Sequence, residues 1–107
     1  MNDEKILSIL RVINDETRLK IIKILAQRGT MCACKILDSL QITQGTLSHH
    51  MKVLGEVGIV RYTRDGKYCN YSLVKEPICE LNKYLRQICE NVSTETCESC
   101  HTDTTKK

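Results

Sequence analysis

One stretch limits the fold more than any other: a hairpin-like segment that directly follows a helical one. Residues 59–74, "IVRYTRDGKYCNYSLV", contain two alternating runs of strand-forming residues around Asp65-Gly66, a dipeptide suited to a type I′ turn. In the preceding "QGTLSHHMKVLGEVG", apolar Leu47, Met51 and Leu54 recur at helical spacing. We therefore predict a mainly α fold with a small β-hairpin attached to the end of a helix.

Further helices are predicted on both sides of this unit. A first helix contains Ile6, Ile9 and Ile13, and a second begins at an Asn14 or Asp15 cap and ends at Gly29. A third is expected over roughly Cys32 to Leu40, followed by the turn "QIT" and a fourth helix capped by Thr43. A last helix follows Pro77. The expected order is four helices, two strands and one helix.

The third and fourth helices with the hairpin have the order of a winged helix-turn-helix, in which the second helix of the pair enters the major groove. Polar groups on this helix would bond base edges or phosphates, and a basic wing would reach the adjoining backbone. Plain helix packing is the alternative interpretation. The candidate DNA-binding residues are Gln44, Thr46, Ser48, His49, Lys52, Arg64 and Lys67.

Composition sets wider limits. The chain has 107 residues, a formal charge of +3, seven Cys and no Phe or Trp. This supports one domain, permits binding to duplex DNA and argues against aromatic stacking on single strands. The acidic opening and the lack of a long apolar run predict a cytoplasmic protein with reduced thiols and no membrane partner. We expect the domain to span residues 1–92 and residues 93–107 to form a flexible, cysteine-bearing tail.

The last helix carries an apolar seam at alternating spacings of three and four residues: Ile78, Leu81, Leu85, Ile88 and Val92. Such a seam is typical of a helix that packs against another helix. Because a chain of this length covers little surface by itself, we expect a homodimer formed through the first and last helices.

Over about residues 5–90 the chain resembles the ArsR/SmtB family of bacterial metal-sensing repressors. The resemblance rests on "DETRL", "SHHMKVL" followed by "GIV", and the C-x-C of "CAC". It implies a homodimer that represses its operon on an inverted repeat of double-stranded DNA and dissociates when metal binds. It also implies that Gln44, Thr46, Ser48 and His49 face DNA, that His50 takes a position more often structural, and that Cys32 and Cys34 form the metal-sensing pair.

The cysteine pair raises a geometric problem. On a regular helix, residues i and i+2 point about 200° apart, so Cys32 and Cys34 can hold one ion only if the helix start is frayed or bent. Metal capture that distorts this turn is one interpretation, and core packing is the other. Tail residues Cys97 and Cys100, spaced as C-x-x-C before His101, are candidate additional ligands.

Thiolate ligands favour thiophilic ions. Three thiolates would suit As(III) or Sb(III), which the family resemblance favours here, and four would suit Cd(II), Pb(II) or Zn(II). The alternatives are a thiol-redox or persulfide-sensing repressor of the same fold, a C-x-x-C oxidoreductase, c-type haem attachment at "CESCH" and a protein-interaction module. No catalytic arrangement is present, so we expect neither an enzyme nor a small-molecule substrate.

Overall fold

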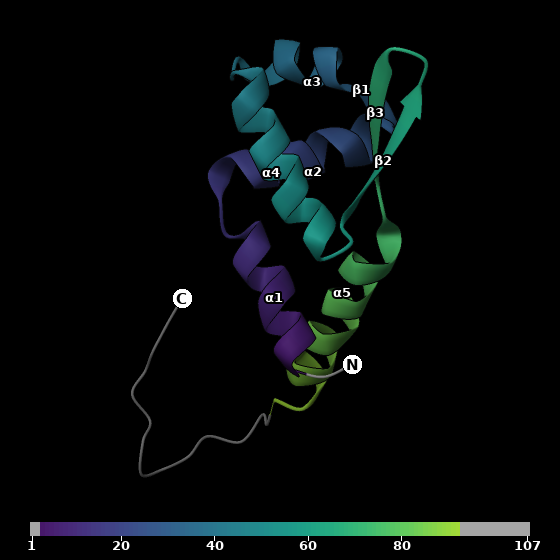
Figure 1. Cartoon of the computed structure of the whole chain (residues 1–107). Coiled ribbons are helices and arrows are strands. Elements are labelled where there is room, and N and C mark those ends of the chain that lie inside the picture. The colour runs from purple at the N-terminus through teal and green to yellow at the C-terminus, as the bar shows by residue number, and fades with distance from the viewer. Residues whose placement is uncertain (1–2, 93–107) are drawn as a thin grey trace.

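The computed structural model describes residues 3–92 and has the predicted winged helix-turn-helix architecture (Figure 1). Its elements, in chain order, are α1 (Asp3–Ile13), α2 (Glu16–Arg28), β1 (Met31–Cys32), α3 (Ala33–Leu40), α4 (Gln44–Glu56), β2 (Val60–Asp65), β3 (Tyr68–Leu73) and α5 (Lys75–Glu90). The predicted order of helices and wing strands is confirmed, with one short strand added. The expected tail, residues 93–107, lies outside the described residues.

Capping residues set the helix starts as the sequence predicted. The Asp15 carboxylate accepts a hydrogen bond from the backbone N–H of Arg18 at 3.0 Å, which caps α2. The Thr43 hydroxyl accepts one from the backbone N–H of Thr46 at 3.1 Å, which caps α4. At the far end of α2, Gly29 adopts a φ of 78°, a conformation that favours glycine. Local hydrogen bonding therefore determines where the two helices begin.

The core lies where α1 to α4 meet the sheet. The apolar positions predicted for α4 are all buried: Leu47, Met51 and Leu54. They belong to one cluster of buried side chains, whose other members are Ile9, Ile21, Leu25, Met31, Ile36, Ile59 and Val60. The inner side of α4 is thus fixed in the core, which leaves its polar side outward.

The sheet has three antiparallel strands in the order β1-β3-β2, one more strand than predicted. In the additional pairing, Met31 lies opposite Tyr71 and Cys32 opposite Asn70. A strand of two residues cannot display the alternation that identifies a strand in a sequence. The expected third helix therefore starts one residue late, at Ala33, because Cys32 belongs to β1.

The wing turn also differs from the prediction. Asp65 pairs with Tyr68, so the two loop residues are Gly66 and Lys67 rather than Asp65 and Gly66. Of these two, Gly66 alone has a positive φ, 63°, which fits a type II′ turn with glycine first rather than the predicted type I′. The strand pairing shifted the turn by one residue and placed Lys67 at its tip.

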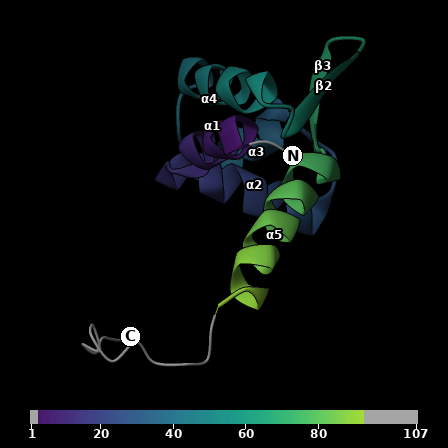
Figure 2. The same ribbon diagram turned by 90° about the horizontal axis from the view of Figure 1, so that it is seen from below.

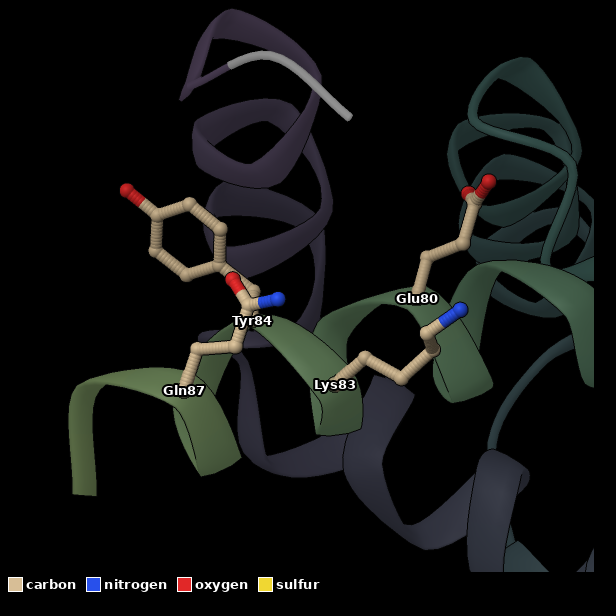
Figure 3. A pocket seen from close by; sticks show the side chains of 4 residues that line it. All are labelled: Glu80, Lys83, Tyr84 and Gln87. Atoms are coloured by element: carbon tan, nitrogen blue, oxygen red, sulfur yellow. The ribbon is translucent and has the colours of Figure 1, made fainter. Parts of the chain in front are cut away.

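Helices α1 and α5 lie side by side at the end of the molecule opposite the wing tip (Figures 1 and 2). The Tyr84 hydroxyl of α5 donates a hydrogen bond to the Asp3 carboxylate of α1 at 2.8 Å. Tyr84 also lines a polar depression along α5 with Glu80, Lys83 and Gln87 (Figure 3). Among the described residues, no helix combines the length and apolar character needed to cross a membrane.

Candidate DNA interface and thiol site

The outer side of α4 presents the candidate DNA-reading groups. Every polar position singled out on this helix is exposed: Gln44, Thr46, Ser48, His49 and Lys52. The Thr43 hydroxyl donates to the Thr46 hydroxyl oxygen at 2.9 Å, so the Thr46 proton stays available to an outside acceptor. The exposed side of α4 therefore offers donors and acceptors to a major groove.

The wing stands beside this helix (Figure 1). Ser48 and Lys52 of α4 and Tyr62 of β2 line one depression of about 220 Å³. Arg64 and Lys67 are exposed near the wing tip; the Arg64 Nε–H donates to the Gly66 carbonyl at 3.2 Å. Ser48 and Lys52 thus share one depression with Tyr62 of the wing, and Gln44 at the start of α4 shares another with Lys67.

Cys32 and Cys34 lie at the junction of β1 and α3. The problem raised by regular helix geometry does not arise, because Cys32 is the residue before the helix and has an extended backbone, with φ −76° and ψ 155°. The expectation that the two thiols point to opposite sides of a helical turn is therefore wrong. Only Cys34 is helical, and both cysteines line one depression.

The two thiols differ in their pKa. The hydrogen bond from Cys34 lowers the pKa of Cys32, and the backbone N–H of Lys35 acts in the same direction. The same thiol contact raises the pKa of Cys34, with burial as the second cause. Cys32, at the start of a helix, is therefore the readier thiolate, as expected for a cysteine near a helix N-terminus.

The pair opens into a depression of about 220 Å³ between α3 and the wing. Gln44 and Lys67, two candidate DNA-binding residues, line it with the cysteines. Cys69 of β3, which the sequence suggests as a strand-filling residue or a further ligand, also lines it, and its Sγ lies 3.3 Å from the Tyr62 hydroxyl oxygen. The unpredicted pairing of β1 with β3 brings this third cysteine close, and no sequence pattern signalled it.

Within residues 3–92, no group of three or more His, Cys, Asp or Glu side chains is arranged to hold a metal ion. Cys32 and Cys34 are the candidate donors that lie in the described part of the chain. The other candidate ligands, Cys97 and Cys100, lie outside the described residues. Two adjacent thiols, one of them favoured as thiolate, are a suitable donor set for a thiophilic ion.

Comparison with known proteins adds independent evidence. Residues 15–62 match the family described as bacterial regulatory protein, arsR family. An uncharacterized HTH-type transcriptional regulator of Methanocaldococcus jannaschii is 39% identical over 85 residues, covering 79% of this chain and 96% of the relative. The arsenical resistance operon repressor of Staphylococcus aureus is 33% identical over 105 residues, covering 91% and 100%. A cadmium resistance regulatory protein CadC homolog from the same organism is 31% identical over 80 residues, covering 75% and 66%.

Solved structures agree on the fold. The crystal structure of an ArsR family transcriptional regulator superimposes with a TM-score of 0.75 at 19% identity, covering 87% of this chain and 98% of that one. The match over residues 15–62 contains the caps, the helix-turn-helix and the first part of the wing described above. The chain therefore belongs to the ArsR family of DNA-binding transcriptional regulators and is not an enzyme.

Proposed function

We propose that this regulator is a metal-responsive repressor that binds an inverted repeat as a homodimer and dissociates when a thiophilic ion binds its cysteines. One observation carries the proposal: Cys32 and Cys34 line the same depression as Gln44 of α4 and Lys67 of the wing. An ion captured there acts on both parts of the candidate DNA interface. The names of the arsenical and cadmium resistance relatives support the same class of inducer.

The proposal that α4 and the wing bind DNA rests on the exposure and position of their polar side chains. Gln44, Thr46, Ser48 and His49 would read base edges, because they occupy the solvent side of a helix whose other side is buried. Lys52, Arg64 and Lys67 would bind phosphates and contribute the part of the affinity that depends on salt.

The proposal of a homodimer rests on exposed apolar side chains of α5 and α1. Along α5, Ile88 is 53% exposed and Val92, just beyond the helix, is 66% exposed. Neighbouring α1 contributes exposed Leu7 and Leu10. Apolar side chains concentrated on two adjacent helices favour burial against a second copy. That arrangement would place two α4 helices on successive major grooves.

The proposed inducer follows from the chemistry of the cysteine ligands. Cys32 and Cys34 would provide two thiolates, and Cys97 and Cys100 would complete the set. Three thiolates suit As(III) or Sb(III), which we favour, and four suit Cd(II), Pb(II) or Zn(II). When bound, the ion supplies strong thiolate bonds, whose free energy is large enough to reshape a helix end.

Release follows from the connections of Cys32. Through β1 it pairs with Asn70 in the wing, and through α3 and residues 41–43 it connects to the start of α4. Only three residues join α3 to α4, and the first of them, Gln41, ends α3 in a left-handed conformation with φ 57°. Displacing Cys32 toward an ion would therefore tilt the recognition helix or the wing, and either movement breaks the spacing required by the operator.

The test is release from DNA in a reducing buffer. A duplex selected by the protein from a random-sequence pool is bound, and arsenite, antimonite, Cd(II), Pb(II) and Zn(II) are titrated separately while fluorescence anisotropy reports binding. Release by a thiophilic ion but not by Mg(II) supports the proposal. Release by peroxide or persulfide alone, with none by metal, would assign the cysteines to redox sensing instead.

A further inference from the structure

A polar contact joins three helices behind the DNA-reading side of α4. The Arg18 side chain, from the first turn of α2, donates through Nε–H to the Val12 carbonyl in the last turn of α1, at 2.6 Å. Its Nη1 lies 3.2 Å from Nδ1 of His50, in the middle of α4. Arg18 thus connects the helix expected at the dimer interface with the helix expected in the major groove.

The contact fixes the form of the His50 ring. Arginine has no acceptor, so Nη1–H must donate and the His50 Nδ1 must accept, which leaves the ring proton on Nε2 and the imidazole neutral. The His50 side chain is only 12% exposed. Burial lowers its pKa, and the charges of Arg18 and His49 act in the same direction, while the Asp15 carboxylate opposes them.

We propose that Arg18 and His50 form a clamp that sets the angle of α4 relative to α1, and that specific DNA affinity depends on this clamp. The proposal relies on the proposed dimer, because in a dimer joined through α1 the angle between α1 and α4 determines the separation of the two recognition helices. Arg18 and His50 are positioning residues. His49, the exposed neighbour, contacts DNA.

Protonation would open the clamp. A proton on Nδ1 turns the acceptor into a donor and places two cations 3.2 Å apart. From the packed elements, the charged or titratable groups facing His50 are Asp15 and Arg18 of α2 and His49 of α4. Of these only Asp15 favours the protonated ring, from 4.0 Å. Because the clamped state lowers the pKa, it is fully populated at high pH and is lost as the pH falls below the ordinary histidine value of 6.5.

The experiment measures specificity against pH. A duplex selected at pH 7.5 and a scrambled duplex are each titrated with the full chain between pH 7.5 and 5.5, and the ratio of their dissociation constants is followed. For the unmodified protein we expect this ratio to fall as the pH drops below 6.5, because protonation of His50 then opens the clamp. His50→Asn, whose amide oxygen can accept from Arg18 but does not titrate, should bind well at pH 7.5 and show no fall.

Controls separate the clamp from other effects. His49→Asn should weaken specific binding at every pH but still show specificity falling with pH, because it leaves the contact between Arg18 and His50 intact. Arg18→Lys, which loses the guanidinium fork, should lose specificity already at pH 7.5. The proposal would be overturned if the specificity of His50→Asn fell with pH as much as that of the unmodified protein, or if Arg18→Lys kept full specificity at pH 7.5.

A measurement without DNA tests the same clamp and distinguishes its failure from failure of the proposed function. NMR of the His50 ring should show the Nε2–H tautomer and a pKa below 6.5. A pKa at or above that value would overturn the clamp. Failure to select any duplex would refute DNA reading by α4 and would leave the NMR result to decide the Arg18–His50 contact on its own.

Discussion

Replacing Leu85 and Ile88 together by alanine should dissociate the proposed dimer. The two side chains are 49% and 53% exposed in the single chain, and full burial of a Leu or Ile side chain contributes about 1.5–3 kcal/mol. Burying the exposed half of each would therefore contribute about 1 kcal/mol. Two such side chains from each of two subunits contribute about 4 kcal/mol, so the double variant should raise the dimer dissociation constant about a thousandfold.

Sedimentation equilibrium over nanomolar to micromolar concentrations measures this constant. Leu19→Ala is the matched control, because Leu19 is a leucine of similar exposure, 45%, on α2 rather than on the proposed interface; it should dimerise normally. An unmodified protein that stays monomeric at ten micromolar would refute the dimer. So would a double variant that associates as tightly as the control.

Three more predictions concern DNA reading, the thiols and the core. Thr46→Ala should reduce affinity for the selected duplex more than for a scrambled one in a gel-shift titration, and equal losses would contradict base reading. Iodoacetamide at pH 7 should alkylate Cys32 before Cys34, as read by mass spectrometry, because its pKa is the lower although Cys34 is the more exposed; the reverse order would contradict the assignment. Ile36→Ala, at a fully buried position, should lower the free energy of unfolding by about 2–5 kcal/mol in urea denaturation, and a loss below 1 kcal/mol would mean that the core there can collapse.

The parts of the fold that could be predicted are those determined by local chemistry. Asp15 and Thr43 begin helices because each side chain accepts a hydrogen bond from the backbone N–H three residues later, and such caps can be predicted from the sequence. The buried stripe of α4 follows from helical spacing. These features locate α4 and its exposed polar side, which explains why the candidate DNA-binding positions could be named in advance.

The thiol site could be predicted only in part, because it depends on a pairing distant in sequence. Cys32 is extended because β1 pairs with β3, some forty residues later, and nothing in "MCACKIL" indicates that. The same pairing brings Cys69 to the depression. The contact between Arg18 and His50 is likewise a product of tertiary packing, since 32 residues separate its members. Residue types identified the candidate site residues, and the tertiary structure determined which of these side chains lie close together.

The central claim is that an ion bound at Cys32 and Cys34 releases DNA, and Cys34→Ser tests it most directly. The variant and a matched control, Cys89→Ser at an exposed cysteine of α5, are bound to the selected duplex in reducing buffer and titrated with arsenite and with Cd(II). We expect both to bind DNA like the unmodified protein, and only Cys89→Ser to release it. Release of Cys34→Ser at the same ion concentration as the control would contradict the account.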